Sequence, residues 1–190
     1  MKLLEEKILR DGKLGEGDVL KVDSFLNHQI DVAFLSEVGK EFHRLYAGEK
    51  VDKILTIEAS GIGVACLTAE QFGCPVVFAK KTKTNNIYAD VYRADVYSYT
   101  HDRAYEIVVS KEFLHAGERI LIIDDFLAKG SALTALLKLI RSAGAVPVGA
   151  GIVIEKAFQP GRELLQKEGL RIESLARIAS MSVADGITFC

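Results

Sequence analysis

The run Ile120-Leu-Ile-Ile-Asp-Asp-Phe-Leu-Ala-Lys-Gly-Ser-Ala132 joins an apolar strand to a turn of small residues, which opens a helix expected over 130–143. Backbone N–H groups at a helix N-terminus form an anion site, and small residues let a phosphate approach them closely. Asp124 and Asp125 beside that site can accept hydrogen bonds from two neighbouring sugar hydroxyls. The run therefore suits a ribose 5-phosphate, although an ordinary strand–turn–helix junction with acidic caps has the same pattern.

On both sides of this run, short apolar segments alternate with amphipathic ones. We expect strands near 53–57, 75–79, 106–109, 119–124, 146–154 and 170–178, and helices near 31–46, 61–73 and 130–143. This alternation predicts one α/β domain over residues 1–190, with a mainly parallel twisted sheet flanked by helices. Ligands of such sheets bind at the carboxyl ends of the strands, so the chemistry is expected after residues 57, 79, 124 and 154.

Composition narrows the class of protein. The chain has 190 residues, of which 49% are hydrophobic and 26% charged, too apolar for a disordered protein. A net charge of −2 provides no overall basic field for nucleic acid or an anionic membrane. The three cysteines show no metal-ligand spacing, and the N-terminal residues lack the apolar block of a signal peptide. We therefore expect a cytoplasmic protein that acts on small molecules and binds neither nucleic acid nor membrane.

Two further segments are polar where strands are expected to end. Glu58-Ala-Ser-Gly-Ile-Gly63 is a glycine-rich turn that can offer backbone donors to a diphosphate, but close packing of a helix on a strand explains the glycines as well. Residues 82–104 are rich in Thr, Asn, Tyr, Asp and Arg and show weak β-alternation. They predict an exposed hairpin or a flap that closes over the site.

The run at 120–132 resembles the phosphoribosyl-pyrophosphate (PRPP) motif of the type I phosphoribosyltransferases: an apolar strand, two acids, a small-residue loop and a helix. More narrowly, residues 22–31 and 152–162 are similar to those of the bacterial xanthine phosphoribosyltransferases, and the resemblance extends over nearly the whole chain. It implies the type I phosphoribosyltransferase fold, with a small hood from residues 1–30 and 156–190 and a flexible flap over 82–104.

The resemblance also implies a role for individual residues. Asp124 and Asp125 would face the ribose as the catalytic acids. The loop that holds the 5-phosphate would be Ala128, Lys129, Gly130, Ser131 and Ala132. The pyrophosphate site would contain Ser60, Gly61 and Lys81. The residues that bind xanthine would be Leu20, Asn27 and Lys156.

The implied reaction converts xanthine and PRPP to xanthosine 5'-monophosphate (XMP) and pyrophosphate in purine salvage. Mg²⁺ would arrive bound to PRPP, with no metal held by the protein alone, and the enzyme would be a homodimer. Hypoxanthine–guanine enzymes of the family carry a third aspartate where this chain has Ala128, which fits xanthine because xanthine loses its proton more readily.

Two alternatives stay open. One is a guanine or hypoxanthine phosphoribosyltransferase. The other is a ligand-sensing regulator built on the same fold, which would need a helix-turn-helix segment and a basic face. The hood-like sequence begins by residue 20 and the net charge is negative, so the regulator is disfavoured.

Overall fold

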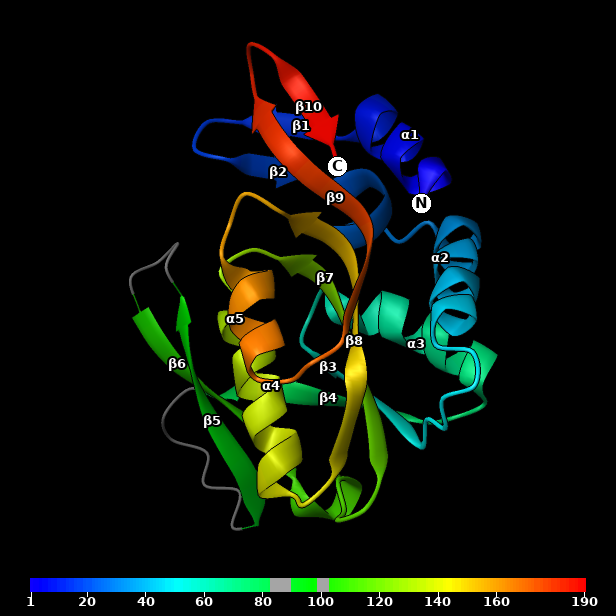
Figure 1. The fold of residues 1–190 in the computed structure, drawn as a ribbon, viewed down its shortest axis with the longest axis vertical. Helices are drawn as coiled ribbons and strands as arrows, with labels where there is room; N and C mark the ends of the chain where they lie inside the picture. Colours follow the sequence, from blue (N-terminus) through cyan, green and yellow to red (C-terminus); the bar gives the residue numbers. More distant parts are fainter. Residues whose placement is uncertain (83–89, 99–102) are drawn as a thin grey trace.

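The computed structural model describes residues 1–82, 90–98 and 103–190. Its helices are α1 (Lys2–Asp11), α2 (Val32–Leu45), α3 (Gly61–Phe72), α4 (Ser131–Ser142) and α5 (Gly161–Lys167). Its strands are β1 (Lys13–Gly15), β2 (Val19–Lys21), β3 (Lys53–Ile57), β4 (Val76–Thr82), β5 (Val91–Ser98), β6 (Arg103–Ser110), β7 (Arg119–Leu127), β8 (Val146–Lys156), β9 (Ile172–Ser182) and β10 (Gly186–Phe189). Figure 1 shows their arrangement, with a π-helical turn at Asp23–Asn27 and a 3-10 turn at Lys111–Phe113.

The main sheet has the strand order β10-β9-β8-β7-β3-β4-β6-β5. Strands β9, β8, β7, β3 and β4 run parallel. At one edge β10 pairs antiparallel with β9, and at the other β6 pairs antiparallel with β4 and β5 antiparallel with β6. The predicted mainly parallel α/β sheet is confirmed. Strand β3 is buried along its whole length, as its uninterrupted apolar run indicates for a central strand covered on both faces.

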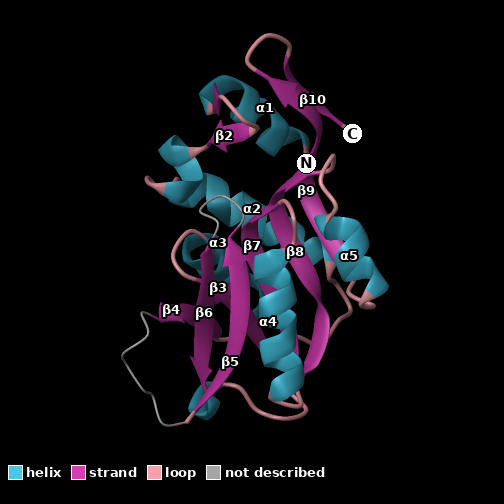
Figure 2. Cartoon of the chain, turned by 90° about the vertical axis from the view of Figure 1, so that its left-hand side faces the viewer, coloured by secondary structure: helices cyan, strands magenta, loops and turns pink. Residues whose placement is uncertain are grey.

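Helices cover both faces of the sheet (Figure 2). The core on one face contains apolar residues of α4, β5 and β6, and the core on the other contains those of α1, α2 and α3. The predicted helix bounds have visible causes. Asp31 caps α2 by accepting a hydrogen bond from the backbone of Phe34 at 3.1 Å, and α3 ends where Gly73 takes a left-handed conformation at φ 64°.

The strand that carries the two carboxylates is longer than the sequence indicates. We expected it to end at Asp124, but β7 continues to Leu127. The cause is β8, which stays paired with β7 past the carboxylates, at Phe126 with Ile154 and at Leu127 with Glu155. Asp124 and Asp125 therefore lie inside the strand and not in the loop beyond it.

The N- and C-terminal segments lie together beyond the carboxyl end of the sheet (Figure 1). The N-terminal amine donates a hydrogen bond to the carbonyl of Leu175 on β9, and α1 and β1 both contact β9. Leu4 and Ile8 of α1 and Phe25 of the π-helical turn are buried in this region. The prediction had placed no helix at residues 2–11 and no hairpin at 13–21. The hood limits of 1–30 and 156–190 stay a prediction.

The segment expected as an exposed flap is in part a layer of the sheet. β5 pairs with β6, and β6 pairs with β4. Ala94 and Val96 of β5 and Ile107 of β6 are buried against the core beneath α4. The predicted hairpin is thus present, but its inner face is not exposed. Of the predicted flap, residues 83–89 and 99–102 lie outside the described residues.

Candidate active site

The two carboxylates of β7 lie beside the glycine-rich turn that joins β3 to α3. The Asp124 side chain is only 3% exposed. A Cβ atom on Gly61 would lie 3.1 Å from Asp124 Oδ1 and 2.1 Å from Thr56 Oγ1, so a side chain at position 61 has no room. Thr56 Oγ1 is itself buried without a hydrogen-bond partner. The glycine at position 61 is therefore required for close packing of the turn on β3 and β7, which is one of the two explanations considered above.

The carboxylate pair is electrostatically unusual. Burial, followed by the neighbouring Asp125 carboxylate, raises the pKa of Asp124 well above its ordinary value. Burial also raises the pKa of Asp125, although hydrogen bonds from the Phe126 backbone, at 2.9 Å, and from the Ser60 side chain act in the opposite direction. A buried acid beside a half-buried one favours a proton shared between the two carboxyl groups. A bound cation or a pair of sugar hydroxyls can take the place of that proton.

Lys81 on β4 brings a positive charge near the two carboxylates. The charge of Lys81 lowers the pKa of Asp124 against the larger effect of burial. The Lys81 ammonium lies 5.5 Å from the centre of the Tyr105 ring, and its backbone N–H donates to Glu58 at 2.6 Å. The predicted pyrophosphate residues Ser60, Gly61 and Lys81 are therefore gathered around the carboxylates.

The whole predicted phosphate loop lines a cavity of about 510 Å³. All five loop residues, Ala128 to Ala132, line it together with Lys156 and Gln159 from the end of β8 and the turn beyond. Its other walls include residues 17–19 of the β1–β2 hairpin, the end of β7 and Leu133 of α4, and the side chains of Val96, Tyr97 and Tyr105 on the β5–β6 hairpin. The cavity thus joins the phosphate loop to the predicted base-binding lysine.

Lys156 connects the core of the molecule to the hood. Its ammonium donates a hydrogen bond to the Asp18 carbonyl at 2.7 Å and lies 5.9 Å from the centre of the Phe126 ring. Burial lowers the pKa of Lys156. Leu20 and Asn27 do not line this cavity, and neither do the carboxylates of β7 or the predicted pyrophosphate residues Ser60, Gly61 and Lys81. Leu20 is 7% exposed, with its side chain in the hood core, and Asn27 is exposed at the end of the π-helical turn. Their contact with the base stays a prediction.

A larger cavity of about 660 Å³ lies between β4, β6 and the 3-10 turn. It is lined mainly by apolar residues such as Val77, Phe78 and Val108, and it contains none of the predicted site residues. Two lysines line it: Lys53 forms an ion pair with Glu118 at 2.8 Å, and the Lys80 ammonium lies 5.9 Å from the centre of the Phe78 ring. The predicted phosphate loop at the start of α4 and Lys156 line the 510 Å³ cavity instead, so that cavity is the candidate active site.

Known proteins are similar to this chain in sequence. Residues 22–171 match the family model of the phosphoribosyl transferase domain. The chain is 53% identical over 186 residues to a xanthine phosphoribosyltransferase of Lachnoclostridium phytofermentans, covering 98% of this chain and 96% of that one. It is 57% identical over 179 residues to xanthine phosphoribosyltransferase 1 of Clostridium perfringens, covering 94% of each. The chain belongs to the phosphoribosyltransferase family.

The fold of this phosphoribosyltransferase recurs among solved structures of the family. The adenine phosphoribosyltransferase of Rhodothermus marinus aligns with a TM-score of 0.74 at 17% identity, covering 93% of this chain and 99% of that one. At that identity, the likeness establishes the shared architecture alone.

Several residues of the phosphoribosyltransferase cavity were missed in the sequence. Tyr105 lies one position beyond the predicted flap, and its weak alternation with neighbouring strand residues was the available signal. Asp18 takes a left-handed conformation at φ 59° directly after Gly17 at φ 71°. A Gly-Asp pair between two short strands is a hairpin signal that would have placed this turn. Nothing in the sequence indicates that the turn meets Lys156.

No group of three His, Cys, Asp or Glu side chains suited to a metal ion occurs in residues 1–82, 90–98 and 103–190. In the same part of the chain, every helix is too short or too polar to cross a membrane.

Gly130 gives a direct test of the phosphate loop. Its φ is 86°, and a Cβ atom there would lie 3.1 Å from the Cα of Gly161. Gly130→Val should therefore distort the loop and raise the KM for PRPP by about tenfold or more, because small misplacements of a binding group are costly. The matched control is Gly144→Val, at φ 69° beyond α4, which is expected to lower the melting temperature and leave this KM unchanged. A normal KM in Gly130→Val would remove the loop from the site.

Burial of Asp124 predicts that the stability of the folded protein depends on pH. Because the pKa of Asp124 is raised in the folded state, the folded protein keeps a proton that the unfolded chain releases above about pH 3.8. Stability is thus lost as the pH rises through the raised pKa. Asp124→Asn, whose amide replaces the protonated acid, should melt at a higher temperature than the wild type at pH 7, with the difference shrinking toward pH 3.8. Thermal melts at several pH values test this, and a variant that melts lower at pH 7 would contradict it.

Proposed function

We propose that the protein is a xanthine phosphoribosyltransferase, a pentosyltransferase that makes XMP and pyrophosphate from xanthine and PRPP. The observation that supports this most is the single cavity that joins the 128–132 loop to Lys156 in a chain 53–57% identical to proteins of that name. The cavity has the 128–132 loop at the start of α4 on one side and the Lys156 ammonium on another.

Each group of residues in the proposed site binds a different part of the substrates. The loop holds the 5-phosphate at the N-terminus of α4, where N–H groups and the helix dipole favour an anion. Asp124 and Asp125 accept hydrogen bonds from the ribose hydroxyls and favour positive charge that develops on the sugar. Ser60 and Lys81, with the backbone at Gly61, receive the diphosphate as the bond between the anomeric carbon and its oxygen breaks. A ring nitrogen of the base forms the new bond to that carbon and loses its proton.

Xanthine suits a site without an acid at position 128. Xanthine ionises more readily than hypoxanthine or guanine, so it needs less help from a base in the loop. Lys156 is a point cation that only donates hydrogen bonds, which favours an oxygen with negative charge at the purine edge. Asn27 and Leu20 complete the proposed base site from the hood when the substrate is bound.

Mg²⁺ belongs to the substrate in this proposal, as the metal complex of PRPP. Its preference for oxygen ligands fits the carboxylates of the β7 pair and the diphosphate. We also propose a cytoplasmic homodimer that uses small-molecule substrates and binds neither nucleic acid nor membrane, as the family resemblance and the near-neutral net charge of −2 suggest.

Product identification tests the function. The purified protein is incubated with PRPP and Mg²⁺ and with xanthine, hypoxanthine, guanine or adenine in separate reactions, and the nucleotide formed is identified by mass. XMP from xanthine is the expected product. Formation of only the guanine or hypoxanthine nucleotide would move the protein to that branch of the family. No nucleotide from any base would overturn the proposal.

A further inference from the structure

A buried ion pair lies directly behind the proposed base-binding lysine. Glu155 precedes Lys156 on β8 and is only 1% exposed. The Arg162 guanidinium holds its carboxylate with two parallel bonds, Nε to Oε1 at 2.8 Å and Nη2 to Oε2 at 2.6 Å. Arg177 on β9 lies 3.4 Å from Oε1. A buried carboxylate is tolerated only when it is paired in this way.

Arg162 ties three elements together. Besides Glu155 on β8, it donates to the Ile172 carbonyl at 3.2 Å and to the Ser174 hydroxyl at 3.1 Å, both on β9. Its own backbone belongs to the first turn of α5. Burial alone would raise the pKa of Glu155, but the hydrogen bonds from Arg162 and Ser174 outweigh it and hold that pKa below its ordinary value. The carboxylate is thus kept ionised inside the fold.

Glu155 and Arg162 flank the turn at 156–161. This turn contacts the hood at one end and the phosphate loop at the other. At one end of the turn, Lys156 donates to the Asp18 carbonyl of the hood at 2.7 Å. At the other end, the Gly161 backbone N–H donates to the Ala128 carbonyl of the phosphate loop at 3.0 Å. A Cβ atom on Gly161 would lie 2.3 Å from that carbonyl oxygen and 2.9 Å from the Gly130 nitrogen. The turn and the phosphate loop are therefore packed without any gap.

We propose that Glu155 and Arg162 are positioning residues that place Lys156 against the base and hold the 128–132 loop against the 5-phosphate. We call this ion pair the clasp. Neither side chain lines the cavity, so the clasp acts through the turn at 156–161. It makes base selectivity and PRPP affinity depend on one buried contact. This inference rests on the proposed function, because it assigns the two ends of the cavity to base and phosphate.

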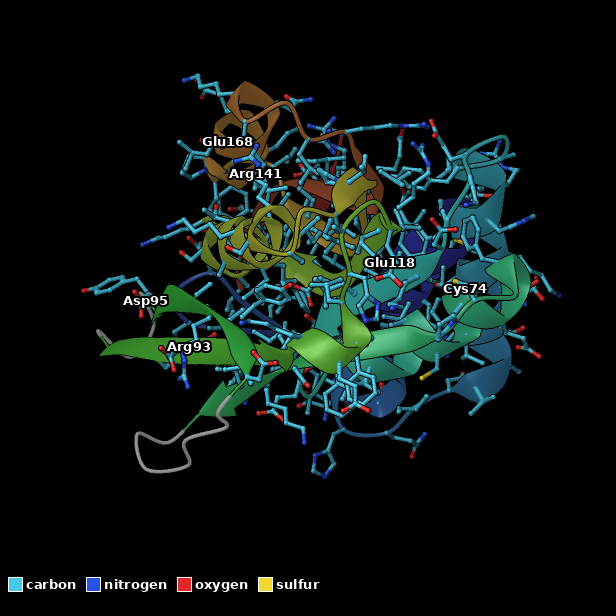
Figure 3. The ribbon with its side chains drawn as sticks, turned by 90° about the horizontal axis from the view of Figure 1, so that it is seen from below. Cys74, Arg93, Asp95, Glu118, Arg141 and Glu168 are labelled. Atoms are coloured by element: carbon cyan, nitrogen blue, oxygen red, sulfur yellow. The ribbon has the colours of Figure 1, made fainter. Side chains whose placement is uncertain are left out.

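The chain offers a matched control for the clasp. Arg141 on α4 bonds the Glu168 carboxylate at 2.6 Å and its carbonyl at 2.8 Å, just beyond the other end of α5. Figure 3 shows Arg141 and Glu168 side by side. Both side chains are about half exposed, at 48% and 51%. This pair also anchors α5, but it contacts neither the turn at 156–161 nor the phosphate loop.

The test compares Arg162→Gln with Arg141→Gln. Arg162→Gln should raise the KM for both PRPP and xanthine, by roughly tenfold or more, because a shift of about 1 Å in a positioning group is enough for such losses. It should also reduce the preference for xanthine over hypoxanthine. Arg141→Gln should leave both KM values and the preference unchanged. A purely structural role would lower the folded fraction, which reduces apparent kcat and leaves KM as it was.

Two further variants separate an effect on KM from a loss of folded protein. Arg162→Lys keeps the charge but not the two parallel bonds, and should show the same KM changes in smaller degree. Glu155→Gln combined with Arg162→Gln removes both buried charges and should recover stability without recovering KM. Unchanged KM values in all the clasp variants, or equal changes in Arg141→Gln, would overturn the clasp alone. A wild type that makes no nucleotide would overturn the proposed function first.

Discussion

Asp125→Asn is expected to reduce turnover with every accepted purine by about a hundred- to a thousandfold, the usual cost of removing one preorganised charge from an active site. Asparagine keeps the shape of the side chain and an oxygen that can accept from the Phe126 N–H, which Asp125 Oδ1 now accepts at 2.9 Å. The fold should therefore survive. What is lost is the negative charge that favours positive charge on the ribose in the transition state.

The comparison that gives this result its meaning is Asn27→Ala. Asn27 is exposed in the hood and is proposed to contact only the base, so its loss should be smaller and should differ between xanthine and guanine. The kcat/KM of each variant with each base is the measurement. A loss in Asp125→Asn confined to one base would place the carboxylate at the base. Equal fractional losses for xanthine and guanine in Asn27→Ala would count against base recognition by that side chain.

Lys156→Ala is expected to lower kcat/KM with xanthine by roughly ten- to a hundredfold and to affect hypoxanthine far less. Charge-assisted hydrogen bonds are worth about 1.5–3 kcal/mol, which corresponds to that range. Xanthine carries an oxygen at C2, hypoxanthine has only hydrogen there, and guanine has an amino group that repels a donor. Guanine use should improve slightly, because the contact between two donors disappears.

Lys156 also bonds the Asp18 carbonyl at 2.7 Å, so its removal frees the hood turn as well. Lys156→Gln separates the two effects, because the amide can still donate to Asp18 but carries no charge. It should lose most of the xanthine preference while keeping the PRPP KM. The rates are measured with PRPP saturating. A uniform drop across xanthine, hypoxanthine and guanine would place Lys156 in the scaffold, and an unchanged xanthine rate would remove it from the site.

The parts of the fold that follow from local chemistry were predictable. Asp31 at the start of α2 and Gly73 at the end of α3 mark their helices through hydrogen bonding and backbone conformation alone. The loop at 128–132 is recognisable for the same reason, because a strand, two acids and a small-residue turn are contiguous in the chain. The predicted loop residues and Lys156 do line one cavity.

What could not be predicted depends on contacts between distant segments. Helix α1 buries only Leu4 and Ile8, and it is anchored by the bond from the N-terminal amine to Leu175, far along the chain. The end of β7 is set by β8 and not by its own residues. Glu155 and Arg162 are seven positions apart, across a turn that contains Pro160, and no sequence periodicity pairs them. Their partnership is visible only once the turn is folded.

The proposed cavity selects xanthine and joins it to PRPP. In a competition reaction, equal concentrations of xanthine, hypoxanthine, guanine and adenine compete for limiting PRPP in the presence of Mg²⁺, and the four nucleotides are quantified at early times. Under these conditions the product ratio reports the ratio of kcat/KM values. We predict that XMP exceeds each of the other nucleotides. An excess of the hypoxanthine, guanine or adenine nucleotide over XMP would show that the cavity does not select xanthine.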